Sequence, residues 1–428
     1  MEHTITNLTF AEKAKKNFKE YIVTYVFLVL IIIFVAFSGQ KLESVFMQLM
    51  SRLVRNLFIV LALIIPIVSG MGINFAITIG AMAAQVSLLL VINWELKGII
   101  GLLVAAAMTV PLGALFGFLI GSLLNKMKGQ ETIGSMILGY FANGAYQLLF
   151  LFVFGKLIPL SDKVTIVGAT GVANTLNLIG DVGLQGVLDN LIKISFTQAL
   201  YGVTAIMAVS AIVLFACKKL SKKRFITYIV SSVLVAGIYT IPAVKGCFWL
   251  VSVPVVTFLI IGALCVFNIV IMRTRLGQKF RAVGQNRVVA NASGINVDRV
   301  RITAIILSTV LAGWGQLIFL QNLGTLQTYA AHEMVGLYAG AAILVGGASI
   351  DRATNSQAFI GCLLFHTLFV VAQDFGSNIF GDPNIGEFFR VFLCYGVIAL
   401  ALVMYAFRSA NEKKNPANGV RPTAKAAK

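Results

Sequence analysis

The stretch "YIVTYVFLVLIIIFVAF", residues 21–37, is an unbroken apolar run. A transmembrane α-helix needs about 20 mostly apolar residues, whereas a transmembrane β-strand alternates apolar and polar residues over about 10. The stretch shows no such alternation and therefore predicts a membrane-spanning helix. No convincing cleavage site of small residues follows it, so we interpret it as an uncleaved first helix and not as a removed signal peptide.

The rest of the chain has the same character. Of its 428 residues, 58% are hydrophobic and only 12% are charged, against about 25% charged residues in soluble domains. We therefore predict an all-α, polytopic integral membrane protein with about 10–12 transmembrane helices. The predicted spans lie near residues 21–37, 54–70, 75–92, 98–124, 134–154, 200–217, 225–241, 248–272, 303–322, 334–349, 357–373 and 388–407.

The formal net charge of +18 raises the question of a nucleic-acid partner, and its distribution answers it. If the N-terminus is cytoplasmic, 25 of the 34 Lys and Arg residues fall in predicted cytoplasmic segments. This is the positive-inside pattern, so the basic excess follows the faces of the bilayer and indicates no nucleic acid. We expect three regions: a cytoplasmic segment 1–20, a transmembrane domain 21–408 and a disordered cytoplasmic tail 409–428, with both termini inside.

Two predicted outer segments stand apart from the spans. Residues 155–199 form the longest extracytoplasmic connection, and apolar residues at helical spacing in 182–196 predict an amphipathic helix on the outer membrane surface. Residues 374–387, "DFGSNIFGDPNIGE", predict a turn-rich outer loop.

Small residues at a spacing of four predict close helix packing. Gly113, Gly117 and Gly121 form two overlapping GxxxG units, and Gly336 and Gly340 form another. Such spacing lets two helix backbones approach each other closely.

Motifs for catalysis and nucleotide binding are absent from the sequence. It holds no HExxH, GxSxG or GxxxxGK[ST] motif, its three histidines are far apart, and its five cysteines show no CxxC spacing. We expect no catalytic residue, no metal site and no cofactor bound by this chain, so any ATP must bind another polypeptide.

Uncharged polar residues within the spans suggest a path for a polar solute. Gly70 and Gly72 break the apolar run just before Asn74, as in the interrupted helices that line transport cavities. Any one polar residue could instead hydrogen-bond a neighbouring helix, but a cation pump would carry more intramembrane acids. The predicted pathway residues are Asn74, Phe75, Gln85, Asn143, Gln147 and Gln316.

Residues 273–302 interrupt the apolar chain with seven Lys and Arg residues and one acid, Asp298. Within them, "NRVVANASG" (286–294) predicts a short helix that ends at Gly294. The segment could be basic only for topology, but a compact helix at the cytoplasmic face is also what a partner protein could bind.

Several motifs resemble the permease subunits of ATP-binding-cassette (ABC) importers for simple sugars such as ribose, with nucleoside and branched-chain amino-acid permeases as relatives. The specific matches are "RTRLGQKFRAVGQN" (273–286), "ANASGINVDRVR" (290–301) and "STVLAGWGQ" (308–316); looser ones are 69–82 and 336–349. The long outer segment, an extra hairpin at 200–241 and "IDRATNSQA" after residue 349 depart from the family pattern.

The resemblance implies an architecture and a set of partners. The cytoplasmic loop would carry a coupling helix that docks on a separate ATPase subunit, which binds ATP and Mg²⁺. An extracytoplasmic solute-binding protein and a second permease subunit, identical or related, would complete the importer in the bacterial inner membrane. The residues expected to contact the ATPase are Arg281, Gly284, Asn286, Ala290, Ser293 and Gly294, with Gly284 and Gly294 bounding the helix.

Two alternatives stay open at this point. The chain could be a branched-chain amino-acid permease of the same superfamily, or an ion-coupled secondary transporter that works without an ATPase. The second alternative predicts uptake by the isolated chain, and the first does not.

Overall fold

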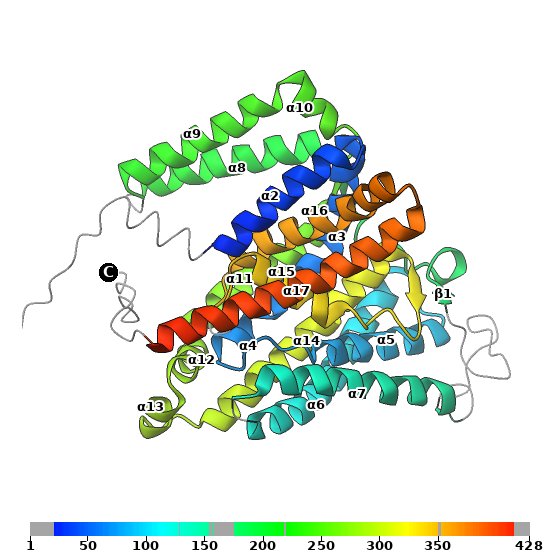
Figure 1. Cartoon of the computed structure of the whole chain (residues 1–428), viewed down its shortest axis with the longest axis vertical. Helices are drawn as coiled ribbons and strands as arrows, with labels where there is room; N and C mark the ends of the chain where they lie inside the picture. Colours follow the sequence, from blue (N-terminus) through cyan, green and yellow to red (C-terminus); the bar gives the residue numbers. More distant parts are fainter. Residues whose placement is uncertain are drawn as a thin grey trace, which may run out of the picture.

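A computed structural model describes residues 21–127, 129–153, 157, 175–217, 220–349 and 352–414. In this part of the chain, long helices run side by side and form one bundle (Figure 1). The predicted N-terminal segment 1–20 and residues 158–174 of the outer segment lie outside the described residues.

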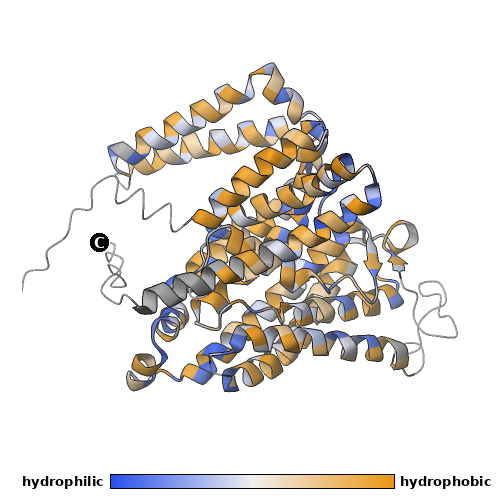
Figure 2. Cartoon of the chain, in the orientation of Figure 1, coloured by the Kyte–Doolittle hydropathy of each residue, from blue (hydrophilic) through white to orange (hydrophobic). Residues whose placement is uncertain are grey.

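Each predicted span overlaps a helix, which confirms the all-α class. The span 54–70 is divided between the helices Leu42–Ala62 and Ile64–Val68, and the span 248–272 begins before its helix. Apolar residues cover these helices along most of their length (Figure 2). The twelve helices are α2 (Ile22–Phe37), α3 (Leu42–Ala62), α5 (Ile77–Asn93), α6 (Gly98–Lys126), α7 (Glu131–Phe152), α8 (Phe196–Ala216), α9 (Lys222–Tyr239), α11 (Val255–Arg273), α14 (Val297–Leu323), α15 (Val335–Val345), α16 (Asn355–Phe380) and α17 (Pro383–Lys414).

The helices differ in length, and α15 is the shortest of the twelve. Within the described part of the chain, six spans are long and apolar enough to cross a membrane: Leu42–Val68, α6, α8, α11, α14 and α16. Helix α15 has only 11 residues, which at 1.5 Å per residue cover about half of a hydrocarbon core of about 30 Å. The predicted span 334–349 is therefore a half-length helix.

Helix α14 lies at the centre and packs against α3, α5 and α6. Its contact with α6 uses the predicted glycine stripe: a β-carbon on Gly113, Gly117 or Gly121 would lie 3.2, 2.8 or 3.1 Å from an α14 Cα atom. The distance at Gly117 is shorter than real β-carbon contacts, and those at Gly113 and Gly121 are shorter than most, so glycine favours the close approach of the two backbones. The packing interpretation of the first two GxxxG units is confirmed.

Short elements join the helices. They are α4 (Ile64–Val68), α10 (Pro242–Cys247), α12 (Arg275–Gln285), α13 (Arg287–Ala292), the 3-10 helix η1 (Gly180–Val182) and strands β1 (Thr175–Asn177), β2 (Lys193–Ser195), β3 (Ser252–Pro254) and β4 (Thr325–Gln327). Antiparallel pairs β1–β4 and β2–β3 fasten the segment 175–195 to two helix ends. In Figure 1 the strand β1 and the helix α13 lie at opposite ends of the bundle, and α17 ends on the α13 side.

The amphipathic helix predicted for 182–196 is wrong. The chain there forms turns followed by β2, with Gly183 and Gly186 at positive φ. The Gly186 N–H donates to the carbonyl oxygen of Gln321 (2.7 Å), and the Leu188 N–H donates to the Gln321 side chain. Residues 182–196 therefore form hydrogen bonds to the end of α14 in place of the hydrogen bonds that a helix of their own would contain.

The predicted outer loop 374–387 is also mostly helical. Helix α16 continues to Phe380, Gly381 ends it in a left-handed conformation, and α17 begins at Pro383. A β-carbon on Gly376 would lie 3.0 Å from Gly386 Cα, so two glycines allow a tight antiparallel hairpin. Helix α17 also extends to Lys414, inside the predicted tail, whose remaining residues are outside the described part of the chain.

The extra hairpin predicted at 200–241 is present as α8 and α9, which pack against each other at the edge of the bundle (Figure 1). Helix α8 is mostly exposed, as expected for a helix whose apolar surface faces lipid.

Candidate functional site

Residues 69–76 interrupt the helical path between α4 and α5. Gly70 and Gly72 adopt positive φ (74° and 71°), which a residue with a β-carbon rarely adopts. Ser135 on α7 accepts a hydrogen bond from the Phe75 N–H (3.0 Å) and lies 3.3 Å from the Ile73 carbonyl oxygen. Helix α7 thus satisfies backbone groups that a continuous helix would have paired, as non-helical backbone at membrane depth requires.

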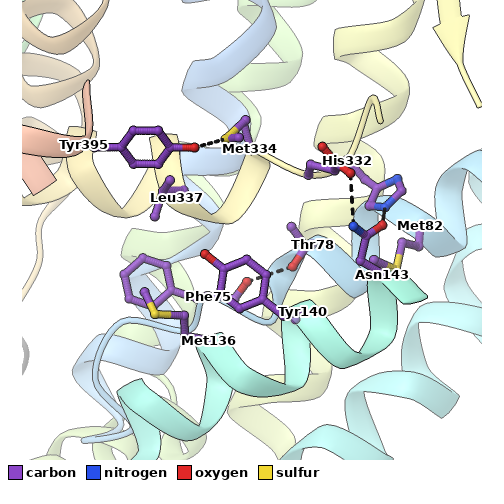
Figure 3. Close-up of a pocket in the computed structure, with 12 residues that line it drawn as sticks. Phe75, Thr78, Met82, Met136, Tyr140, Asn143, His332, Met334, Leu337 and Tyr395 are labelled. Atoms are coloured by element: carbon purple, nitrogen blue, oxygen red, sulfur yellow. Dashed lines mark hydrogen bonds between the residues drawn. The ribbon is translucent and has the colours of Figure 1, made fainter. Parts of the chain in front are cut away.

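A cavity of about 210 Å³ lies beside this broken segment, between α5, α7, α15 and α17 (Figure 3). Most of its wall is aromatic, aliphatic or thioether. Asn143 and His332 lie at one side of the cavity, and Tyr395 lies at the opposite side (Figure 3). The lining residues are Phe75, Thr78, Met82, Met136, Gly139, Tyr140, Asn143, His332, Glu333, Met334, Leu337 and Tyr395.

A chain of five polar side chains leads from the buried interior to the cavity. The Tyr146 hydroxyl donates to Gln85 Oε1 (2.6 Å), and His332 Nδ1 lies 3.0 Å from the same oxygen. His332 Nε2 lies 2.8 Å from Asn143 Oδ1, and the Asn143 amide donates to Glu333 Oε1 (3.1 Å). Asn143 therefore joins a fully buried histidine to a carboxylate at the cavity wall.

The start of α15 packs directly on the broken segment. A β-carbon on Gly336 would lie 2.4 Å from the Phe75 carbonyl oxygen, and one on Gly340 would lie 2.7 Å from the Phe75 ring. The GxxxG unit of Gly336 and Gly340 thus packs α15 against the cavity wall and not against a long helix.

The six predicted pathway residues have different positions. Phe75 and Asn143 line the cavity, while Gln85 lies behind it in the polar chain. Asn74 is buried and accepts from the Ala76 N–H (3.1 Å), so it shapes the broken segment. Gln316 donates to the Ala331 carbonyl oxygen (3.1 Å) and supports the loop before α15. Gln147, on α7, is absent from the cavity lining.

Sequence reasoning missed His332, Glu333 and Tyr146 as parts of this site. His332 and Glu333 were visible as an ionisable pair at the edge of a predicted span, but their position also suited simple exposure to water. Residue His332 is 0% exposed. Ionisable residues in or beside a membrane span often mark a functional site, and the pair His332–Glu333 is the feature of the sequence that indicates this one.

The basic segment 273–302, predicted to be cytoplasmic, contains two short helices, α12 and α13. Asn286 caps α13 by accepting from the Val288 and Val289 N–H groups (3.0 and 3.1 Å). After α13, Gly294 adopts φ +80°, and the Ile295 N–H donates back to the Ala290 carbonyl oxygen (3.1 Å). This is the glycine C-terminal cap that the sequence predicted.

The predicted start of the coupling helix needs correction. Gly284 lies within the last turn of α12. The residue that caps the N-terminus of α13 is Asn286 and not Gly284. Glycine is needed at position 284 because α12 packs closely on the backbone of residues 68–70. A β-carbon on Gly284 would lie 2.2 Å from the Val68 carbonyl oxygen and 3.1 Å from the Gly70 nitrogen.

The other predicted coupling residues divide into two groups. Arg281 donates to the Met272 carbonyl oxygen (2.8 Å), which ties α12 to the end of α11, and Ala290 is the buried residue of α13. Ser293 is exposed, and its hydroxyl donates to the Val289 carbonyl oxygen (2.9 Å). The outer surface of α13 carries two exposed apolar side chains, Val288 (79%) and Val289 (59%).

A carboxylate joins the basic segment 273–302 to α7. Glu131, in the first turn of α7, forms ion pairs with Arg287 of α13 (2.8 Å) and Arg301 of α14. Arg301 also donates to Asn125 Oδ1 (2.8 Å), so every charged group in the cluster has a hydrogen-bond partner.

Comparisons with known proteins agree on one family. The family described as "Branched-chain amino acid transport system / permease component" matches residues 45–402. The chain is 24% identical to the high-affinity branched-chain amino acid transport system permease protein BraD of Pseudomonas aeruginosa, over 72% of this chain and 85% of BraD. It is 24% identical to the xylose transport system permease protein XylH of Haemophilus influenzae, over 69% and 72% of the two chains.

A nucleoside ABC transporter permease protein, NupC of Lactococcus lactis, is 29% identical over 36% of this chain and 46% of its own length. No solved structure gives a significant match to the chain.

Proposed function

The chain belongs to the permease family of ABC importers, and from this premise we propose that its cavity passes a small uncharged polar solute, a simple sugar or a nucleoside. Members of the family are transporters and not enzymes, and this chain is a multi-pass membrane protein.

The chemistry of the cavity supports an uncharged solute. Among the described residues that line it, Glu333 is the only acid, and none is Lys or Arg. The carboxylate of an amino acid would therefore find no cation among these residues, and Glu333 could pair only with its ammonium group. Hydroxyl or N–H groups, in contrast, can donate to Glu333 and hydrogen-bond Asn143, while Phe75 and Tyr140 offer ring surfaces to a flat face.

Buried polar atoms near the cavity give further support. Within the described residues, Asn74 Nδ2, Gln85 Nε2 and Gln316 Oε1 are buried without a hydrogen-bond partner. All three belong to predicted pathway residues, and each offers a hydrogen bond to a polar solute if the helices around the cavity rearrange.

The helix α13 supports the proposed ATPase contact. Two adjacent valines on a helix of six residues project from the α13 end of the bundle, where a second protein could cover them. In this proposal the ATPase subunits bind ATP and Mg²⁺, and the chain itself binds no cofactor. The α13 face is then cytoplasmic, with both termini on the same side of a bacterial inner membrane.

The opposite end supports the proposed contact with an extracytoplasmic solute-binding protein. There, the described part of the predicted outer segment is folded by two strand pairs into a defined surface. Residues 381–382, which remain of the predicted loop 374–387, offer far less surface. We place the binding protein on the segment 175–195 and assign a second permease subunit, identical or related, to complete the importer.

The proposal is tested by uptake in proteoliposomes that contain the chain with its ATPase and solute-binding subunits. Radiolabelled ribose and uridine are offered with ATP, and excess unlabelled leucine is added as competitor. We expect ATP-dependent uptake of at least one of the two labelled solutes, no inhibition by leucine, and no uptake by the chain alone. Uptake by the chain alone would favour an ion-coupled transporter. Absence of ribose and uridine uptake, together with ATP-dependent uptake of radiolabelled leucine in a parallel assay, would instead favour a branched-chain amino-acid permease, in line with the similarity to BraD.

A further inference from the structure

One carboxylate oxygen, Glu131 Oε1, receives both arginines of the cluster. Arg287 is the first residue of α13, and Arg301 lies in the second turn of α14. Glu131 stands in the first turn of α7, and its other oxygen accepts from the Gly129 N–H (3.0 Å). Three helices therefore meet at a single side chain.

The same two arginines also contact the broken segment. Arg287 Nη2 donates to the Gly70 carbonyl oxygen (2.9 Å), and Arg301 Nε donates to Met71 Sδ (2.8 Å). Since Gly70 and Met71 lead directly to Phe75, the cluster joins α13 to the backbone that forms the cavity wall.

Helix α7 provides a second route from the cluster to the cavity. Ser135, one turn after Glu131, holds the Phe75 N–H, and Asn143, two turns further along, contacts both His332 and Glu333. A displacement of the N-terminal turn of α7 relative to the broken segment would thus change the Ser135–Phe75 contact.

The two arginines differ in burial, and this difference separates their roles. The side chain of Arg301 is 0% exposed and that of Glu131 is 7% exposed, whereas that of Arg287 is 32% exposed. If Arg287 moves away, Glu131 and Arg301 remain paired, and Arg287 can be hydrated. If Arg301 moved away from Glu131, a guanidinium buried in the bundle would lose the one acid with which it forms an ion pair among the described residues, which is strongly unfavourable.

We propose that Arg287 is a detachable latch between the cytoplasmic helix α13 and the broken segment 69–76. Engaged, as in this structure, it holds Gly70 and the α7 N-terminus against α13. Displacement of α13 by the ATPase breaks both Arg287 contacts and releases the broken segment, while the Glu131–Arg301 pair stays closed as the fixed joint. The inference rests on the proposed function in one respect, that the ATPase docks on α13.

The test is hydrogen–deuterium exchange by mass spectrometry on the full chain in lipid nanodiscs, without solute or ATPase. We compare the wild type with Arg287→Gln, Arg287→Lys and Arg275→Gln. Arg275 is an exposed arginine of α12 that forms no ion pair with a described residue, so it controls for loss of one cytoplasmic charge.

We expect Arg287→Gln to speed amide exchange in residues 70–76 severalfold, because the contact that holds Gly70 is lost. The melting temperature and the exchange of α6 and α14 should stay at wild-type values. Arg287→Lys keeps a cationic donor and should restore slow exchange, and Arg275→Gln should have no effect.

The comparison variant Arg301→Gln removes the fixed joint and should lower the melting temperature and speed exchange through α6, α7 and α14. The proposal is overturned if Arg287→Gln leaves exchange in residues 70–76 unchanged. It is equally overturned if Arg287→Gln behaves like Arg301→Gln, since Arg287 would then be a structural clamp. The exchange assay contains no solute or ATPase. Its result can therefore be interpreted even if the uptake experiment contradicts the proposed function.

Discussion

Gly284 of α12 and Gly70 of the broken segment are in backbone contact: a β-carbon on Gly70 would lie 2.9 Å from Gly284 Cα. The two residues are far apart in the sequence: Gly284 belongs to the basic segment 273–302, and Gly70 precedes the cavity wall. Their contact links the region that faces the proposed ATPase to the region that faces the proposed solute.

The first prediction concerns this contact. Gly284→Ala places a methyl group 2.2 Å from the Val68 carbonyl oxygen, so α12 must shift away from α4. Overpacking of this kind costs about 1–3 kcal/mol. We expect normal membrane insertion but reduced solute-stimulated ATP hydrolysis in the reconstituted complex. Gly262→Ala on α11, where nothing lies within 4 Å, is the matched control and should behave as wild type. Native coupling in Gly284→Ala would contradict the assignment.

The second prediction concerns the buried ion pair. Glu131→Gln leaves Arg301 without its carboxylate and should destabilise the bundle by about 3–5 kcal/mol. Glu387→Gln removes a carboxylate that is 41% exposed and pairs with Arg390, and should change stability by less than about 1 kcal/mol. Thermal unfolding in detergent distinguishes the two. Similar melting temperatures for both variants would show that Glu131 is not a structural centre.

The third prediction separates two residues of α7. Asn143→Leu removes the side chain that joins His332 to Glu333 and should weaken solute uptake about tenfold, which corresponds to about 1.4 kcal/mol. Gln147→Leu, one turn further along and outside the cavity lining, should leave uptake unchanged. The measurement is the concentration dependence of ATP-driven uptake in proteoliposomes. Equal effects of the two substitutions would place the solute path elsewhere.

The fourth prediction concerns the exposed surface of α13. Replacing both Val288 and Val289 by Ser leaves the α13 caps intact, because Asn286 and Gly294 are untouched. We expect the bundle to keep its melting temperature and the ATPase subunit to be lost in co-purification, since two apolar contact residues are removed. Lys279→Ser on α12 serves as the control. Full recovery of the ATPase with the double variant would remove α13 as the docking element.

Local patterns account for most of what the sequence predicted correctly. Apolar runs such as residues 21–37 become helices because a bilayer satisfies no backbone hydrogen bonds, whatever the neighbouring chain does. The GxxxG stripe of α6 was readable because packing of small residues depends on spacing along one helix. The C-terminal cap at Gly294 was readable because left-handed backbone favours glycine.

The errors arose where distant segments compete for the same backbone groups. Residues 182–196 have the periodicity of an amphipathic helix, but hydrogen bonds to Gln321 and the β2–β3 pairing hold them in another conformation. Residues 374–387 are rich in turn-forming residues, but the close contact of Gly376 with Gly386 keeps most of them helical. No local window contains the partner that decides either case.

The sequence by itself determined the membrane class, the approximate positions of the helices and the glycine-capped helix within the basic segment 273–302, because apolar length and glycine caps act over a few turns. Only the tertiary structure decided the cavity, which draws its wall from Phe75, Asn143, His332 and Tyr395 on four separate elements. The Glu131 cluster was decided in the same way. The physical reason is that a buried polar group is stable only beside a partner, and that partner can come from anywhere in the folded chain.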